Sequence, residues 1–453
     1  MPDIATSALA RLDAALQGRA VGPDDAAWDE ARTAWNLAVD QRPAVVAEAR
    51  SVDDVQQVVR FAAANGLRVA AQGTGHGAPA VPSLDGAVLL RTGALDAIAI
   101  DADARVARLG AGATWGPVAA AAGEAGLAGL AGTSPSVGVT GYTVGGGAGW
   151  LVRRHGLAAW TLRAAEVVTA GGDVLRVDDA EHADLLWVLR GGGAAVVVTA
   201  LEVDLVALPE AYAGGLWWPV ERAPDVLAAW AAALPELPTE VTSIGRLLNV
   251  PDLPMLPEPV RGRSFVVVEA AVAGDATLAD ALLRPLRALS PAMDTFAAMG
   301  PAGLGAVHGD PPAPVPGAGG GALLHELPPA ALAAMVAAAG AGSGTALIGV
   351  EVRHLGGAVA DGAGVPAVLD RIAEPFASFA VGLAADPASR AATEASLADV
   401  AEAFAPWTST RTLPTLADAP IDPVAAYGDA AARLRDVERT YDPDGLIVVN
   451  RRG

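Results

Sequence analysis

A glycine-rich loop follows a predicted strand early in the chain, and two prolines decide what it can become. Residues 67–72 predict the strand, and Gly-Thr-Gly-His-Gly occupies positions 73–77. Gly73, Gly75 and Ala78 match the dinucleotide fingerprint G-x-G-x-x-A, which needs a helix directly after the loop. Pro79 and Pro82 exclude that helix, because proline lacks the amide hydrogen and clashes with the preceding turn. The loop therefore predicts a nest of backbone N–H groups facing a phosphate rather than a Rossmann unit.

A second glycine-rich stretch, at residues 138–150, has the sequence Gly-Val-Thr-Gly-Tyr-Thr-Val-Gly-Gly-Gly-Ala-Gly-Trp. It is too apolar to be a flexible linker, since such linkers combine glycine with serine and other polar residues. Glycine has no Cβ atom and lets the backbone approach another group closely. The stretch therefore indicates a backbone surface against a large ligand. A tight-turn segment packed on a sheet is the alternative.

The composition excludes several kinds of chemistry. The chain has no cysteine and no lysine, so all 30 basic residues are arginine. Without cysteine there is no disulfide, thiol nucleophile, Cys-ligated zinc or iron–sulfur cluster. Without lysine there is no Schiff-base enzyme and no P-loop with its phosphate-binding lysine. A net charge of −21 repels nucleic acids and anionic membranes, so we expect no nucleic-acid partner. We expect no metal site either.

Length and apolar content predict two domains and no membrane segment. A chain of 453 residues is long for one hydrophobic core, and 52% of its residues are apolar. The first thirty residues carry several acidic residues, Asp3, Asp13, Asp24 and Asp25 among them, and lack a basic start, so they do not resemble a signal peptide. Apolar stretches such as residues 330–339 are too short to cross a bilayer. We expect a cytoplasmic protein, and the sequence does not indicate its oligomeric state.

Local patterns predict the order of elements along the chain. Between positions 42 and 90 we expect an extended segment, a helix, a strand, a loop and a strand, with Ser51 and Asp54 forming a capping box for the helix. A strand at 106–112 and a hairpin at 167–177 follow. After Pro209 a Pro- and Ala-rich region predicts strands at 264–271 and 347–354 and a mobile loop around residues 319–321. A helix at 429–439 and a short apolar strand come last.

Five segments together resemble the berberine-bridge-enzyme-like group of FAD-linked oxidases, within the vanillyl-alcohol-oxidase or PCMH type of flavoprotein. They lie at residues 35–55, 73–77, 135–158, 185–199 and 441–450. In that family the second segment is the pyrophosphate loop, whose histidine is bonded to the flavin 8α-methyl group. The third segment looks like the second flavin loop. Each motif alone is weak, but their order and spacing make the match specific.

The resemblance implies an α+β, two-domain PCMH-type FAD-binding fold with an inserted α+β substrate domain whose antiparallel sheet covers the flavin. The implied parts are residues 1–206 for the N-terminal part of the FAD-binding domain, 207–418 for the substrate domain and 419–453 for a C-terminal segment that returns to the FAD-binding domain. The implied cofactor is FAD, covalently bound through His76. Doubly attached relatives carry a cysteine near the second flavin loop, so only a single attachment is possible here. For His76 the alternative is an ordinary histidine on a surface loop.

The resemblance also implies the residues that contact the cofactor. They are Gly73, Thr74, Gly75, His76, Gly77, Pro135, Gly138, Thr140, Gly141, Tyr142, Gly145, Gly146, Val198 and Asn450. Among them, Tyr142 is expected to hydrogen-bond near the N1–C2 edge of the flavin and to stabilise the reduced anion. Buried packing is the alternative for this side chain.

Glu351, Arg353 and Tyr142 are the candidate catalytic residues. Strand alternation puts Glu351 and Arg353 on one face of the strand at 347–354 and His354 on the other. The resemblance places that strand opposite the flavin, with Glu351 as base and Arg353 as its electrostatic partner. An internal Glu–Arg ion pair on a half-buried strand explains the same pattern equally well.

The resemblance implies an FAD-linked oxidoreductase that oxidises a small or natural-product alcohol or amine by hydride transfer to flavin N5, with O2 as the expected acceptor. Two departures from the family stand beside the flavin or the substrate. Ala194, Ala195 and Val196 replace the usual Asn-Phe-Gly, and Leu413 and Thr415 stand where a Tyr and an Asn are usual. They keep two alternatives open: a flavin-dependent cyclase of secondary metabolism without net redox change, and a flavin-retaining binding protein.

Overall fold

The first sheet contains the strand that leads into the glycine loop. The computed structural model describes residues 6–193, 195–254 and 257–449. The strands of this sheet are β1 (Arg19–Val21), β2 (Val45–Glu48), β3 (Arg68–Gln72) and β4 (Ala87–Arg91). β2, β4 and β3 pair in parallel and β1 adds an antiparallel edge. Parallel strands are buried on both faces, and the unbroken apolar run of β4 satisfies that requirement.

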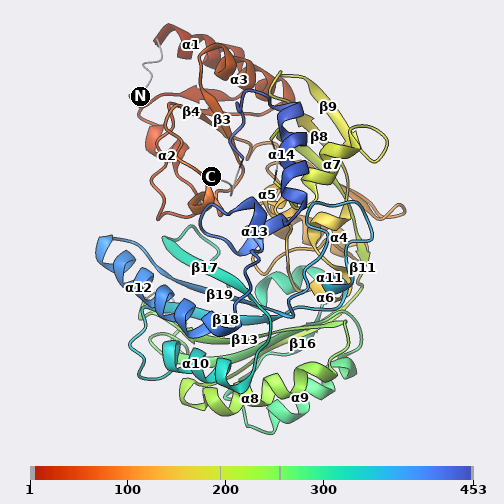
Figure 1. Ribbon diagram of the computed structural model, residues 1–453, viewed down its shortest axis with the longest axis vertical. Coiled ribbons are helices and arrows are strands. Elements are labelled where there is room, and N and C mark those ends of the chain that lie inside the picture. Colours follow the sequence, from red (N-terminus) through yellow and green to blue (C-terminus); the bar gives the residue numbers. More distant parts are fainter. Residues whose placement is uncertain (1–5, 194, 255–256, 450–453) are drawn as a thin grey trace.

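Helix α3 (Val52–Ala64) covers this sheet with the expected apolar stripe (Figure 1). Val55, Val58, Val59 and Ala62 are fully buried. The predicted capping box is only half formed: Ser51 Oγ accepts from the Asp54 amide at 3.1 Å. The Asp54 carboxylate instead accepts from three other backbone amides, those of Gln17, Gly18 and Arg50. The turn after α1 (Thr6–Ala15) brings the Gln17 and Gly18 amides to Asp54, and a purely local motif could not predict that.

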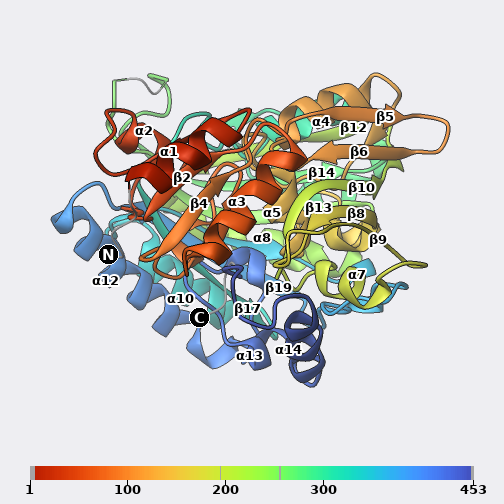
Figure 2. The ribbon, with the colours of Figure 1, turned by 90° about the horizontal axis from the view of Figure 1, so that it is seen from above.

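The second sheet is antiparallel, in the order β5-β6-β10-β8-β9. Its strands are β5 (Ile98–Asp101), β6 (Val106–Gly110), β8 (Leu162–Val168), β9 (Val174–Asp178) and β10 (Val197–Asp204). The hairpin between β8 and β9 confirms the predicted turn, in which Gly172 has a φ of +81°. Short helices pack against this sheet or connect its strands: α4 (Trp115–Gly123), α5 (Val139–Val144), α6 (Val152–His155) and α7 (Ala183–Leu189). Viewed from above, the two sheets lie beside each other over a third, larger sheet (Figure 2).

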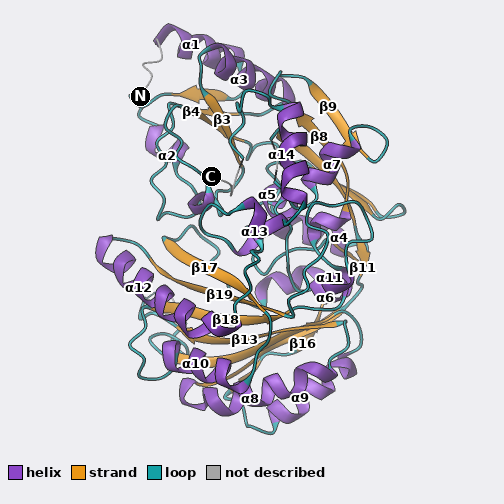
Figure 3. Cartoon of the chain, in the orientation of Figure 1, coloured by secondary structure: helices purple, strands orange, loops and turns teal. Residues whose placement is uncertain are grey.

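The large sheet is antiparallel and has the order β15-β12-β14-β13-β18-β19-β17, with β16 also pairing with β12. Its strands are β12 (Ala211–Pro219), β13 (Val241–Asn249), β14 (Ser264–Val272), β15 (Met293–Asp294), β16 (Ala297–Met299), β17 (Gly317–Leu324), β18 (Leu347–His354) and β19 (Phe376–Leu383). Four helices cover one face (Figure 3): α8 (Ala223–Ala233), α9 (Asp280–Arg287), α10 (Pro329–Ala339) and α12 (Pro387–Phe404). The predicted α+β fold with a separate antiparallel sheet is confirmed, and the other face of that sheet points towards the N-terminal half.

The expectation of a mobile loop around residues 319–321 is wrong, because these glycines form the edge strand β17. Every residue of β17 pairs with β19. A Cβ atom at Gly319 would lie 2.8 Å from the Ala380 carbonyl oxygen, and one at Gly321 would lie 3.0 Å from the Leu416 Cβ. Strand propensity is low for glycine. The β19 backbone and Leu416 lie so close to Gly319 and Gly321 that these positions have no room for a side chain.

The C-terminal segment returns to the N-terminal half of the fold. Helix α14 (Ala430–Tyr441) follows α13 (Pro423–Tyr427) and packs against α7 (Figure 1). Ile447 then forms a parallel bridge with Val69 of β3. Shorter elements complete the chain: α2 (Trp28–Arg32), β7 (Leu127–Ala128), which pairs with β11 (Val206–Ala207), and α11 (Ala358–Asp361). The boundaries after residues 206 and 418 stay a prediction. Among the helices of the described segments, none is long and apolar enough to cross a membrane.

Candidate active site

The loop at residues 73–77 leaves β3 in a conformation that depends on glycine. Gly75 has a φ of +89°, and a Cβ atom there would lie 2.9 Å from the Ala34 Cβ. The Trp35 amide donates to the Thr74 carbonyl at 3.0 Å and ties the loop to the preceding segment. Only a single turn of 3-10 helix, Ala78–Ala80, follows the loop. The predicted absence of a phosphate-binding helix is confirmed.

His76 is held on three sides by neighbouring side chains. The Trp35 ring stacks on the imidazole with 4.0 Å between ring centroids and an interplanar angle of 17°. Thr74 Oγ1 lies 2.8 Å from Nδ1, and Ser136 Oγ lies 3.3 Å from Nε2. Burial lowers the pKa of His76 to about 4, against a smaller opposing effect of Asp310. The imidazole is therefore neutral at physiological pH, and a ring nitrogen keeps the lone pair that a bond to a flavin methyl carbon requires.

The second glycine-rich stretch lies beside the first loop. A Cβ atom at Gly138 would be 3.5 Å from Thr74 Oγ1, in ordinary contact, and one at Gly141 would meet no atom within 4 Å. The Pro135 carbonyl accepts from the Gly116 amide at 2.8 Å, which fixes the start of the stretch. Gly138 then precedes the short helix α5, which the sequence did not predict. The two loops thus come together, with open space at Gly141.

The remaining predicted cofactor residues occupy different environments. Gly145 ends α5, and Gly146 has a φ of +112° and faces Leu369. The Val198 side chain lies in the same apolar core cluster as Val139 and Val144 of α5 and is not exposed to a ligand. Asn450 lies outside the described residues.

Buried polar atoms without partners gather around these loops. They include Trp35 Nε1, Thr140 Oγ1, Tyr142 Oη, Thr143 Oγ1, Trp150 Nε1 and Thr415 Oγ1, none of which has a hydrogen-bond partner in the described segments. A buried polar group without a partner costs about 1–3 kcal/mol, and native proteins contain few of them. A bound group with many donors and acceptors would satisfy them. The residues therefore fit a large polar cofactor such as FAD.

Tyr142 points its hydroxyl into this region. Its ring meets Trp115 edge-on at 5.8 Å and packs against Gly132 and Gly147. Burial raises the pKa of Tyr142 above its usual range, although Arg353 opposes the shift. The hydroxyl therefore keeps its proton and is available as a hydrogen-bond donor.

Glu351 and Arg353 lie on one face of β18, as strand alternation predicts, and form an ion pair with 2.6 Å between Glu351 Oε1 and Arg353 Nε. The other carboxylate oxygen, Oε2, lies 3.1 Å from His308 Nε2. Burial alone would raise the pKa of Glu351, but Arg353 and His308 outweigh it and hold that pKa well below its usual range. A carboxylate of this kind is a weak base. The geometry favours the ion-pair interpretation over the assignment of Glu351 as base.

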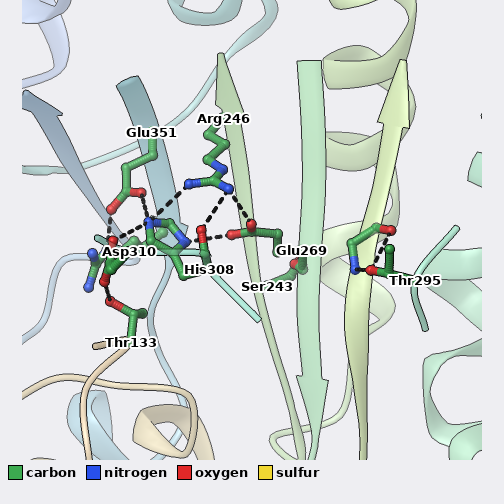
Figure 4. A network of polar contacts seen from close by, with 10 residues as sticks. Thr133, Ser243, Arg246, Glu269, Thr295, His308, Asp310 and Glu351 are labelled. Carbon is green, nitrogen blue, oxygen red and sulfur yellow. Dashed lines mark hydrogen bonds and ion pairs between the residues drawn. The ribbon is translucent and has the colours of Figure 1, made fainter. Parts of the chain in front are cut away.

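His308 sits at the centre of a network that the sequence did not predict (Figure 4). Its Nδ1 lies 2.6 Å from Glu269 Oε2, and its carbonyl oxygen accepts from Arg246 Nη2 at 2.9 Å. Arg246 Nη2 also lies 2.7 Å from Glu269 Oε1. Burial and Arg246 disfavour protonation, but Glu269 and Glu351 prevail and raise the pKa of His308 to about 9. A pKa of about 9 favours a protonated His308 between the two carboxylates, with Arg246 Nη1 also 3.3 Å from Nε2.

The network joins the large sheet to the N-terminal half. Asp310 Oδ2 accepts from Thr133 Oγ1 at 3.0 Å, and Asp310 Oδ1 lies 4.0 Å from His308 Nε2. One signal for this network was present in the sequence: Glu269 stands in the middle of the apolar strand Ser-Phe-Val-Val-Val-Glu-Ala-Ala-Val. A buried charge is rarely left unpaired, so a cationic partner for Glu269 was to be expected. Nothing local identified Arg246 or His308 as that partner.

The family positions occupied by Leu413 and Thr415 supply no acid or base. Leu413 is buried in an apolar cluster, and the Thr415 methyl group would lie 3.6 Å from a Cβ at Gly146. Thr415 thus lies at the end of the second glycine-rich stretch. In the part of the chain that the structure describes, no group of three or more His, Asp or Glu side chains is arranged to hold a metal ion.

Comparisons with known proteins give matches in sequence and in structure. The family model of the FAD binding domain matches residues 43–178. (R)-6-hydroxynicotine oxidase from Paenarthrobacter nicotinovorans is 34% identical over 235 residues, which are 52% of this chain and 49% of that protein. The chain thus spans about half the length of this curated relative.

Solved structures match over almost the whole chain. 6-Hydroxy-D-nicotine oxidase from Arthrobacter nicotinovorans superposes with a TM-score of 0.81 at 26% identity, covering 95% of this chain and 96% of that one. The BBE-like 1 protein of Physcomitrella patens has a TM-score of 0.82 at 18% identity and covers 97% of both chains. The second match concerns the fold alone.

Proposed function

Because the chain belongs to the PCMH-type FAD-linked oxidase superfamily, we propose that it is an FAD-dependent oxidoreductase with the cofactor bonded covalently to His76. The observation that carries this proposal is the environment of His76. A neutral imidazole is fixed by Trp35, Thr74 and Ser136 at the meeting point of the two glycine loops. A surface histidine would need none of these contacts.

Each loop has a distinct part in holding the cofactor. The backbone of residues 73–77 would bind the pyrophosphate, and the second stretch, with Thr140, Gly141 and Tyr142, would line the flavin ring. When bound, FAD supplies the acceptor for a hydride from the substrate, and a histidyl bond raises its redox potential. Tyr142 would donate a hydrogen bond to the flavin from a hydroxyl that stays protonated. The large sheet would exclude water from the opposite side, with Glu351 and Arg353 towards the substrate.

We propose a small or natural-product molecule as substrate and O2 as electron acceptor. An oxidase predicts that substrate bleaches the flavin without oxygen and that peroxide appears when air is admitted. One observation favours the cyclase alternative: neither Leu413 nor Thr415 can accept a proton, and Glu351 is held as a weak base. A cyclase predicts product formation without lasting bleaching or peroxide, and a binding protein predicts neither product nor bleaching.

The covalent bond is tested by denaturing the purified protein in acid and asking whether the yellow colour stays with the polypeptide. We expect it to stay in the wild type and to separate from the His76→Ala variant. His325→Ala is the matched control, because that side chain lies in a loop outside the site, and it should keep its flavin. If the colour separates from the wild type, the covalent bond is wrong. A colourless wild type would refute the proposed cofactor.

A further inference from the structure

Each carboxylate oxygen of the two buried glutamates on the inner face of the large sheet lies against an Arg or His side chain. Glu269 Oε1 faces Arg246 and Glu269 Oε2 faces His308. Glu351 Oε1 faces Arg353 and Glu351 Oε2 faces His308. All four distances are 3.1 Å or less. A protonated amine entering this face would have to break one of these ion pairs to find a glutamate.

The charges of the whole network cancel. Three groups are positive, Arg246, Arg353 and His308, and the three carboxylates of Glu269, Glu351 and Asp310 are negative. Asp310 is the most accessible carboxylate, with 30% of its side chain exposed, and Thr133 already donates to its Oδ2. A cationic ligand would thus add an uncompensated charge to a neutral, largely buried set.

Hydrogen-bond donors, in contrast, remain free on the same face. Arg353 uses only Nε for its bond to Glu351, and neither Nη1 nor Nη2 donates a hydrogen bond to any described residue. Its side chain is 17% exposed.

We propose that the terminal nitrogens of Arg353 bind an acceptor oxygen of the substrate, so that the site takes an alcohol or carboxylate ligand and rejects a protonated amine. This inference rests on the proposed function and narrows its substrate class from alcohols and amines to oxygen ligands. Arg353 suits this role, because a guanidinium group offers several N–H donors in a fixed plane. Glu351 holds that plane in position through Nε.

The test compares three ligands with the same ring and different head groups: benzyl alcohol, benzoate and benzylamine, which is an ammonium ion at pH 7. Their binding to the protein as purified is measured by titration calorimetry, and flavin content is measured separately by visible absorption. We expect benzoate and benzyl alcohol to bind at least about tenfold more tightly than benzylammonium, the difference typical of one charge-assisted hydrogen bond. Benzylammonium binding as tightly as benzyl alcohol would overturn the inference, and so would a wild type that binds neither oxygen ligand.

Variants assign the effect to Arg353. The double variant R353M/E351Q removes both charges of the ion pair at once, so the network stays neutral. Its affinity for benzoate should be lower than that of the wild type by about tenfold or more. E351Q keeps the guanidinium and should bind benzoate at least as tightly as the wild type. R163Q, an exposed arginine on β8, should change nothing.

The two proposals fail in different ways. Undiminished benzoate binding by a folded R353M/E351Q protein would refute the role of Arg353, whatever the flavin content. A wild type without flavin would refute the proposed function, while the calorimetric comparison could still be made.

Discussion

Replacing His308 should abolish a specific pH dependence of stability. The pKa of His308 is raised from 6.5 to about 9 in the folded protein, because Glu269 and Glu351 overcome the opposing effects of burial and Arg246. A group whose pKa is higher in the folded state stabilises it fully below the unfolded pKa and loses that effect as the pH rises through the folded pKa. One pKa unit corresponds to about 1.4 kcal/mol, so His308 contributes about 3 kcal/mol at pH 6 and almost nothing above pH 9.

The measurement is the free energy of unfolding from denaturant titrations between pH 6 and 9.5, followed by circular dichroism. We expect the wild type to lose about 3 kcal/mol over this range through His308. His308→Gln should be less stable at pH 6 and should lack that part of the slope, because glutamine cannot carry the charge. His182→Gln, an exposed histidine beside α7, should keep the wild-type slope and serves as the control.

The same slope in His308→Gln and in the wild type would refute the assignment of a buried imidazolium. A second variant separates charge balance from packing. His308→Gln combined with Glu351→Gln restores a neutral network and should recover part of the stability lost at pH 6. No recovery would mean that the space His308 fills, rather than its charge, stabilises the network.

Three further predictions concern single positions. Gly319→Val should destabilise the protein by about 1–3 kcal/mol in thermal unfolding, because its side chain would collide with β19, whereas Gly320→Ala, which meets no atom within 4 Å, should be neutral. Ser51→Ala should cost about 1 kcal/mol in denaturant titrations, since it removes the N-cap of α3; an unchanged midpoint would show that the cap is redundant. Trp35→Ala should lower the fraction of protein that keeps flavin after acid denaturation, and Trp35→Phe should preserve it, because stacking on His76 needs only an aromatic ring.

The parts of the fold that the sequence predicted are those with a local signal. The strand at 347–354 and the helix after Ser51 were expected from the spacing of their apolar residues. The prolines after the first glycine loop correctly excluded a helix. The strand β17 was missed because its stability comes from pairing with β19 and from close packing. Neither contact can be recognised in the local sequence, which is rich in Pro and Gly.

The candidate site was predicted only in part, for a similar reason. Alternation along one strand was enough to place Glu351 and Arg353 together. Arg246, Glu269 and His308 come from two other strands and a loop, so their meeting depends on the strand order of the large sheet. The tight ion pairing then changes the chemistry expected of Glu351. A carboxylate that is a plausible base in the sequence is paired with Arg353 and His308 in the fold.

The bridge between Val69 and Ile447 determines how long an edge of the first sheet stays exposed during synthesis. The Val69 amide donates to the Leu446 carbonyl and the Val448 amide donates to the Val69 carbonyl, both at 2.8 Å, so the chain near residue 447 covers the outer edge of β3. During synthesis that edge stays exposed while nearly 380 further residues are translated. Uncovered strand edges invite pairing with other chains. The newborn protein is therefore most prone to aggregate before the residues near Ile447 leave the ribosome, and its first sheet is complete only after they do.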